Sequence, residues 1–157
     1  MSSDSNTAPV IDWLKARHAA IMADEAEALA RLEAGDTEGY NEKMRARAEA
    51  VAALAKDAAP VLAKLPEAVR EPVLAGLMRF SQSAATGLQL GSVLYMSALL
   101  YPDDHKPGEP DNLALFIDGL EAGELYCTRL APSAATAASA LRRSLRALSP
   151  RRARGTR

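Results

Sequence analysis

The sequence predicts an all-α fold, a four- to five-helix bundle with an N-terminal antiparallel helical hairpin and a buried central helix. Hydrophobic residues make up 48% of the chain and aromatic residues only 4%, so the core must be built from aliphatic side chains and alanine. Such a composition favours closely approaching helices over a sheet. Apolar residues also recur at helical spacing, and one long stretch carries no charge, which indicates a helix hidden by its neighbours.

The expected domain covers residues 9–125. Residues 1–8 are small and polar, lack the apolar core of a signal peptide, and are expected to be a flexible N-terminus. Residues 126–157 form a low-complexity tail rich in Ala and Arg that is expected to be mostly disordered. Cys127 is the only cysteine, so no internal disulfide can form, which suits a cytoplasmic protein.

The first expected helix runs from Pro9, which suits a first helical turn, to a stop at Gly35. Its inner face follows a helical period and consists of Ile11, Leu14, His18, Ile21, Met22, Leu29 and Leu32. Asp36 or Thr37 can cap a second helix that returns against the first. Its inner face is expected to hold Tyr40, Met44, Val51, Leu54 and Ala58, with Glu42, Arg45, Arg47 and Glu49 toward water.

Three prolines then interrupt the chain at intervals of six residues, Pro60, Pro66 and Pro72. Each removes a backbone donor and crowds the preceding turn, so we expect a bend near Pro60 and a new helix near Pro66. This helix leads into the uncharged run between Arg79 and Asp103, with a break expected around Gly87.

The uncharged run is long enough to cross a bilayer, which is the alternative to burial in a bundle. It contains many polar side chains, which are costly in hydrocarbon but can be satisfied in a protein: Ser81, Gln82, Ser83, Thr86, Gln89, Ser92 and Ser97. The bundle is therefore preferred, and no transmembrane segment is expected.

A surface loop is expected from Tyr101 to Asp111, because Pro102, Pro107, Gly108 and Pro110 break any helix there. Asp111 can cap a last short helix with apolar residues at i, i+3, i+4 and i+7, namely Leu113, Phe116, Ile117 and Leu120. The loop is a candidate partner-binding surface through Tyr101, Asp103, Asp104, His105 and Glu109.

The charges of the chain are divided unequally. Twenty acidic and twelve basic residues precede Ala131, a net charge of −8, and no acidic residue follows it. The tail beyond that point holds seven candidate phosphate-binding arginines: Arg142, Arg143, Arg146, Arg151, Arg152, Arg154 and Arg157. These could neutralise nucleic-acid phosphates, and Ser149 to Arg152 is similar to basic motifs of minor-groove-binding tails.

The tail also carries a second pattern. Ala138, Leu141, Leu145 and Leu148 would line one side of a short helix, with arginines on the other sides. A basic amphipathic helix of this kind could bind an anionic membrane or a partner's groove, or fold against the acidic body of its own chain. A further alternative is a tail that only maintains solubility.

Ser83, Gly87 and Gly91 are spaced by four and predict close helix packing, either within the bundle or in a homodimer. His18 and Glu25 lie seven residues apart on nearly one stripe, which would permit a buried histidine–carboxylate pair. A divalent cation at Asp103, Asp104, His105, Glu109 and Asp111 is disfavoured, because the spacing matches no EF-hand loop.

No motif for nucleophilic catalysis, phosphate binding or zinc binding occurs in the chain, so no catalytic residue, metal or cofactor is predicted. We therefore expect a small cytoplasmic, non-enzymatic interaction or adaptor protein, as a homo-oligomer that binds a protein partner. The alternative is a nucleic-acid-associated protein that binds phosphates through its tail. An enzyme or ligand-binding bundle using His18 and Glu25 ranks third.

Overall fold

The computed structural model describes residues 7–124, and all of the regular secondary structure in this range is helical. The long helices are α1 (Ala8–Glu33), α2 (Thr37–Ala52) and α5 (Glu67–Leu90), and α7 (Asn112–Glu121) is of intermediate length. Three short helices complete the described part of the chain, α3 (Leu54–Asp57), α4 (Ala59–Leu62) and α6 (Val93–Ala98). The predicted all-α bundle is confirmed.

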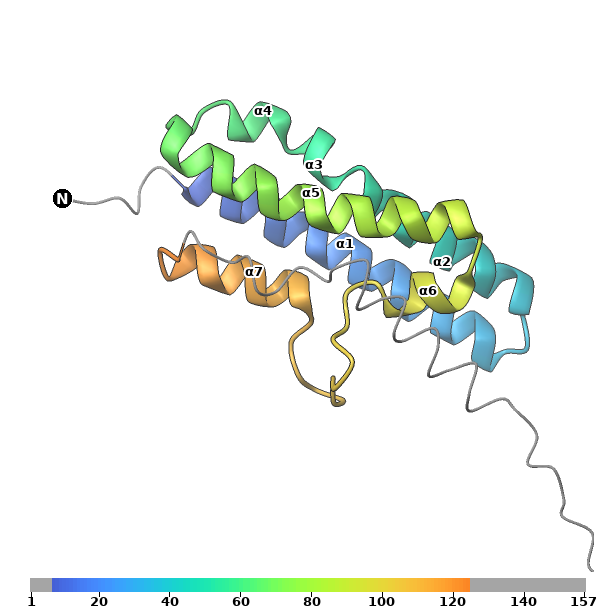
Figure 1. The fold of residues 1–157 in the computed structure, drawn as a ribbon. Coiled ribbons are helices and arrows are strands. Elements are labelled where there is room, and N and C mark those ends of the chain that lie inside the picture. Colours follow the sequence, from blue (N-terminus) through green and yellow to red (C-terminus); the bar gives the residue numbers. More distant parts are fainter. Residues whose placement is uncertain (1–6, 125–157) are drawn as a thin grey trace, which may run out of the picture.

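The hairpin of α1 and α2 forms as the sequence predicts. Pro9 lies in the first turn of α1, and Gly35 adopts a φ of 81° immediately after the helix, a conformation that glycine tolerates best. Asp36 then caps α2 by accepting a hydrogen bond from the Gly39 amide at 2.8 Å. The two helices lie antiparallel and make the largest interface in the bundle (Figure 1).

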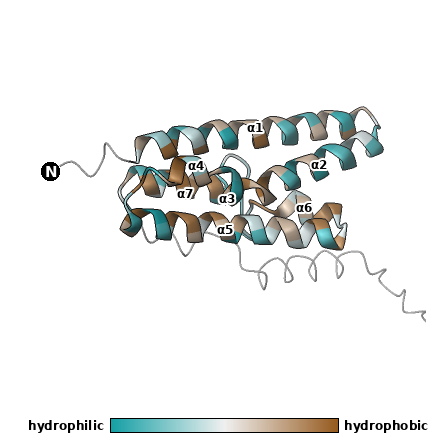
Figure 2. Cartoon of the chain, turned by 90° about the horizontal axis from the view of Figure 1, so that it is seen from above, coloured by the Kyte–Doolittle hydropathy of each residue, from teal (hydrophilic) through white to brown (hydrophobic). Residues whose placement is uncertain are grey.

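The third long helix, α5, closes the bundle. It packs against α2 and α3, while α7 packs against α1, so most of the core lies between α1, α2, α5 and α7 (Figure 1). Phe80 of α5 and Phe116 of α7 meet edge to face, with their ring centroids 5.7 Å apart. Figure 2 shows hydrophobic and hydrophilic residues alternating along the long helices, as expected when each helix buries one side.

The prolines act as predicted near the bend. Pro60 lies in the first turn of α4, and α5 begins directly after Pro66. Pro72 is accommodated inside α5, in its second turn. The uncharged run is two helices instead of one, because α5 continues through Gly87 and ends where Gly91 adopts a φ of 61°. The break therefore lies four residues beyond the predicted position.

Part of the predicted inner face of α1 is not buried. Leu29 and Leu32 are 47% and 43% exposed, whereas Leu14 and Ile21 are buried. The helix α7 covers only the first half of α1, so the last two turns lack a neighbour on that side. None of the helices within residues 7–124 combines the length and the apolar character needed to cross a membrane.

Candidate functional site: an exposed loop anchored on α1

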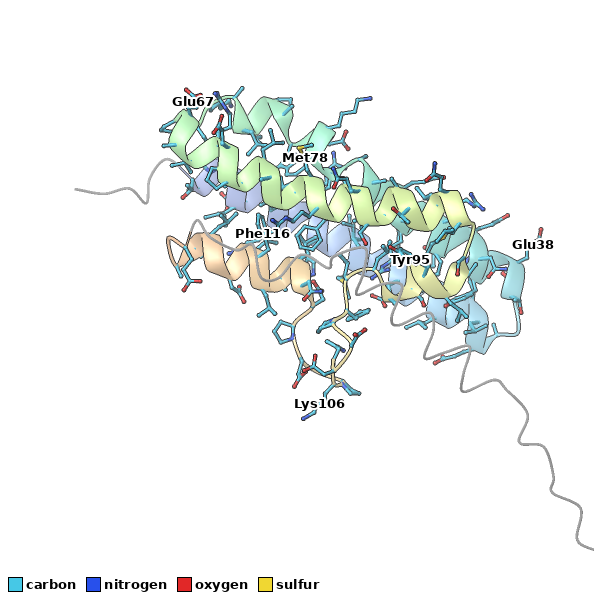
Figure 3. All side chains as sticks on the ribbon, viewed as in Figure 1. Glu38, Glu67, Met78, Tyr95, Lys106 and Phe116 are labelled. Atoms are coloured by element: carbon cyan, nitrogen blue, oxygen red, sulfur yellow. The ribbon has the colours of Figure 1, made fainter. Side chains whose placement is uncertain are left out.

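The loop from Tyr101 to Asp111 joins α6 to α7 and projects from the bundle, with Lys106 at its tip (Figure 3). Internal hydrogen bonds shape it. The His105 amide donates to the Pro102 carbonyl at 3.1 Å, and the Lys106 amide donates to the Glu109 carboxylate at 3.0 Å. One ring nitrogen of His105 also lies 2.9 Å from the Glu109 carbonyl oxygen. The loop is thus two linked turns.

The first end of the loop is anchored on α1. The Tyr101 hydroxyl donates a hydrogen bond to Oε2 of Glu25 at 2.7 Å, and Glu25 is only 9% exposed. Burial, the hydrogen bond to Glu25 and the negative charge of that carboxylate all raise the pKa of Tyr101 far above its ordinary value. The phenol therefore keeps its proton and remains a donor. The His105 ring also contacts the Tyr101 ring, with a centroid distance of 4.5 Å.

Arg47 of α2 completes this anchor and is fully buried. Its Nη1 donates to the Met96 carbonyl at the end of α6 at 2.9 Å, and its Nη2 lies 3.5 Å from Oε2 of Glu25. The guanidinium carbon lies 5.9 Å from the centre of the Tyr101 ring. We call Glu25, Arg47 and Tyr101 the anchor cluster, because they join α1, α2, α6 and the loop.

The predicted orientation of Arg47 toward water is wrong. Met44, Arg47, Ala48 and Val51 occupy i, i+3, i+4 and i+7 of α2, and all four are buried. The spacing alone places position 47 on the inner face, so a signal for its burial existed in the sequence. The charge of arginine argued against it, because an unpaired buried cation is costly. Glu25, 22 positions earlier, supplies the opposite charge.

The second end of the loop is anchored on the same helix. His18 Nε2 lies 2.7 Å from Oδ2 of Asp111, which is 4% exposed. The other oxygen of Asp111 accepts hydrogen bonds from the Leu113 and Ala114 amides at 2.9 Å and so caps α7. Burial would raise the pKa of Asp111, but the bonds from His18 and from these amides outweigh it and hold the pKa below its usual value.

His18 and Glu25 do not form the direct pair that their shared stripe permits. Each binds one end of the loop instead, since His18 contacts Asp111 and Glu25 contacts Tyr101. The stripe prediction was correct in placing both side chains on one face of α1. Their partners come from more than 70 positions away, which local spacing cannot reveal.

The acidic side chains of the loop do not converge. Glu109 turns toward the Lys106 amide, and Asp111 turns toward His18 and α7, while Asp103 and Asp104 are exposed. In residues 7–124, no group of three or more His, Cys, Asp or Glu side chains is arranged to hold a metal ion. The exposed charges of the loop are Asp103, Asp104, Lys106 and Glu109, which leaves it acidic.

Two of the three small residues of the stripe, Ser83 and Gly87, face the inside of their own chain. Ser83 is 5% exposed, and Gly87 lies so close to α6 that an added Cβ would be 2.7 Å from Cδ1 of Tyr95. Figure 3 shows Tyr95 beside α5. Gly91 ends α5 and contacts nothing at its Cβ position. Of the two predicted uses of Gly87, close packing within the bundle is the one the geometry displays.

The predicted phosphate-binding arginines lie outside the described residues, as does the tail that contains them. Comparison with family models, with curated proteins and with solved structures gave no match to this chain.

Proposed function

We propose that this chain is a non-enzymatic helical interaction protein that presents the loop from Tyr101 to Asp111 to a protein partner. The proposal rests on one observation: an exposed loop is held at both ends by polar side chains of one helix, Tyr101 by the buried Glu25 and Asp111 by the partly buried His18. Loops positioned by a rigid scaffold are frequent sites of binding.

Two charged side chains, Arg47 and Glu25, are buried at the first end of the loop. Burial of Arg47 and Glu25 desolvates two ionised groups, and apolar residues of similar volume would often give equal or greater stability. What this arrangement provides is a defined position for the loop and for the end of α6. A loop ordered before binding loses less conformational entropy when a partner engages it.

The acidity of the loop indicates the chemistry of the partner. Asp103, Asp104 and Glu109 outnumber Lys106 as its exposed charges, so a basic protein surface complements it. Self-association through Ser83, Gly87 and Gly91 is not part of this proposal, because Tyr95 already packs against Gly87. A cytoplasmic location remains a prediction from the single cysteine.

The test is capture of partners from cells of the source organism by the full chain, quantified by mass spectrometry. The Asp103→Asn, Asp104→Asn variant should lose a partner that the parent chain retains. A Glu67→Gln, Glu71→Gln variant removes the same charge from exposed positions of α5, and Figure 3 shows Glu67 far from the loop. This control should retain the partner. Equal capture by all three proteins would contradict the proposal.

A second candidate function rests on the tail. Seven arginines and no acidic residue follow Ala131, a composition that supports sequence-independent contacts with nucleic-acid phosphates. Fluorescence anisotropy of labelled DNA and RNA duplexes, titrated with the full chain and with a version ending at Leu130, tests it. Binding by the full chain alone that weakens steeply with salt supports this function, and absence of binding at low salt rejects it.

A further inference from the structure

Exposed leucines gather at one end of the bundle. Four of the five large hydrophobic residues exposed in the described part of the chain are Leu29, Leu32, Leu90 and Leu94, with exposed fractions between 43% and 59%. The first two lie in the last turns of α1, and the other two flank the turn between α5 and α6. Figure 1 shows these segments at the same end of the molecule. We call these four residues the leucine end.

Arg47 of α2 links α1 to α6, the helices that carry three residues of the leucine end. Arg47 joins Glu25 of α1 to the Met96 carbonyl of α6, so α6 approaches α1 one helical turn before Leu29. Leu94 lies two residues before Met96 on α6. Glu25, Leu29 and Leu32 share one stripe of α1. Glu25 is buried, whereas the two leucines that follow it are exposed to solvent. The stripe of α1 thus runs from the buried Glu25 to the exposed Leu29 and Leu32.

We propose that the leucine end is the docking site of the chain's own tail, through the segment from Ala138 to Leu148. In that segment Ala138, Leu141, Leu145 and Leu148 fall on one side of a helix, which gives an apolar stripe to set against the four exposed leucines. The apolar face of an amphipathic helix would then cover an exposed apolar surface, with both supplied by the same chain.

Charge complementarity favours this occupant. Between Asp24 and Glu38 the chain has six acidic residues and one basic residue, Arg31, and Lys43 of α2 pairs with Asp24 and Glu27. Glu33, next to Leu32 in the chain, and Glu38, in the first turn of α2, are both exposed. The docking segment carries Arg142, Arg143 and Arg146 and no acidic residue. In the docked state, the arginines of the segment would therefore lie near acidic residues while its leucines contact the exposed leucines of the bundle.

The length of the connecting chain permits the contact. The described residues end at Glu124, next to α7, whose last residue Glu121 forms an ion pair with Lys15 of α1. From Lys15 to Leu32 the helix rises about 26 Å at about 1.5 Å per residue. The segment from Glu124 to Ala138 spans up to about 46 Å when extended. The tail can reach back along α1 to the leucine end within the same molecule.

A spin label tests the docking on the full chain. The label is placed on Ser139→Cys in a Cys127→Ser background, since position 139 lies away from the apolar side of the segment. The expected result is loss of the backbone amide signals of Leu29, Leu32 and Leu94 in nuclear magnetic resonance spectra, with the signal of Lys64 at the opposite end retained. Retained signals at the leucine end would overturn the proposal.

Two variants distinguish specific docking from charge attraction. Leu141→Asp with Leu145→Asp should restore the signals, whereas Ala140→Asp with Ala147→Asp adds the same charge off the apolar side and should leave the loss in place. Leu29→Ser with Leu32→Ser changes exposed positions, so the bundle should fold while docking is lost. Signal loss that appears equally in a mixture of isotope-labelled chain and unlabelled, spin-labelled chain would identify a second copy as the occupant and overturn the intramolecular proposal.

Discussion

The hydroxyl of Tyr101 donates to the carboxylate of Glu25 at 2.7 Å, across 76 positions of sequence. This bond fixes the beginning of an exposed loop to the middle of α1. The neighbouring Arg47 holds the end of α6 to the same carboxylate. One buried acidic residue therefore determines where three separate segments meet.

Tyr101→Phe should lower the free energy of unfolding by about 1–3 kcal/mol, because Glu25 loses a hydrogen-bond donor while it stays buried. Denaturant titration measures the loss, and hydrogen exchange in the loop should accelerate. The control is Tyr40→Phe, since the Tyr40 hydroxyl makes no hydrogen bond to residues 7–124. Equal effects of the two substitutions would contradict the anchoring role of Tyr101.

Arg47→Met should destabilise the fold by about 3–5 kcal/mol, since it leaves the buried carboxylate of Glu25 without its cation and frees the Met96 carbonyl. Arg45→Met on the exposed side of the same helix should change stability by less than about 0.5 kcal/mol. Thermal or urea unfolding measures the stability of both variants. A stable Arg47→Met variant with an unchanged loop would show that the guanidinium is dispensable.

Stability should fall in acid because of Asp111. Its pKa is held below the ordinary value of 3.8, so its contribution is complete above that value and is lost as the pH falls through the lower pKa of the folded state. Urea unfolding measured across pH gives the free energy of unfolding at each pH. In Asp111→Asn, this free energy should decrease less toward acid pH than in the parent chain. Asp118→Asn, an exposed change on the same helix, serves as the control. If the free energy of unfolding of Asp111→Asn decreases in acid as much as that of the parent chain, Asp111 does not cause the acid sensitivity.

Gly87→Ala should destabilise the bundle by about 1–3 kcal/mol, because the new methyl group would lie 2.7 Å from the buried ring of Tyr95. Combining it with Tyr95→Val should recover part of the loss, which a double-mutant cycle measures as coupling. Light scattering should give the same mass for Gly87→Ala and the parent chain. A change in mass without loss of stability would instead place Gly87 in an interface between copies.

Local signals in the sequence were sufficient for most of the fold. The apolar spacing of Leu113, Phe116, Ile117 and Leu120 predicted α7, and Pro60 with Pro66 predicted the bend. Two caps were also predicted, one at Asp111 and one at Asp36 or Thr37, of which Asp36 is the cap. These features depend on neighbours within a few residues, so a single sequence contains them.

The anchors required information that local spacing lacks. Arg47 sits on an apolar stripe, but its burial depends on Glu25 in another helix, and the partners of His18 and Glu25 lie in a distant loop. Leu29 and Leu32 continue the apolar stripe of α1 and were predicted to be buried. Their exposure depends on where α7 ends, which the pattern of α1 cannot specify.

Backbone nuclear magnetic resonance relaxation of the full chain measures whether the loop from Tyr101 to Asp111 is ordered. Order parameters for residues 103–109 should be near the value of about 0.85 found in rigid backbone, and should fall when Tyr101→Phe is combined with His18→Ala. Values below about 0.6 in the parent chain would show a flexible loop, and would contradict the proposal that α1 holds it in place for a partner.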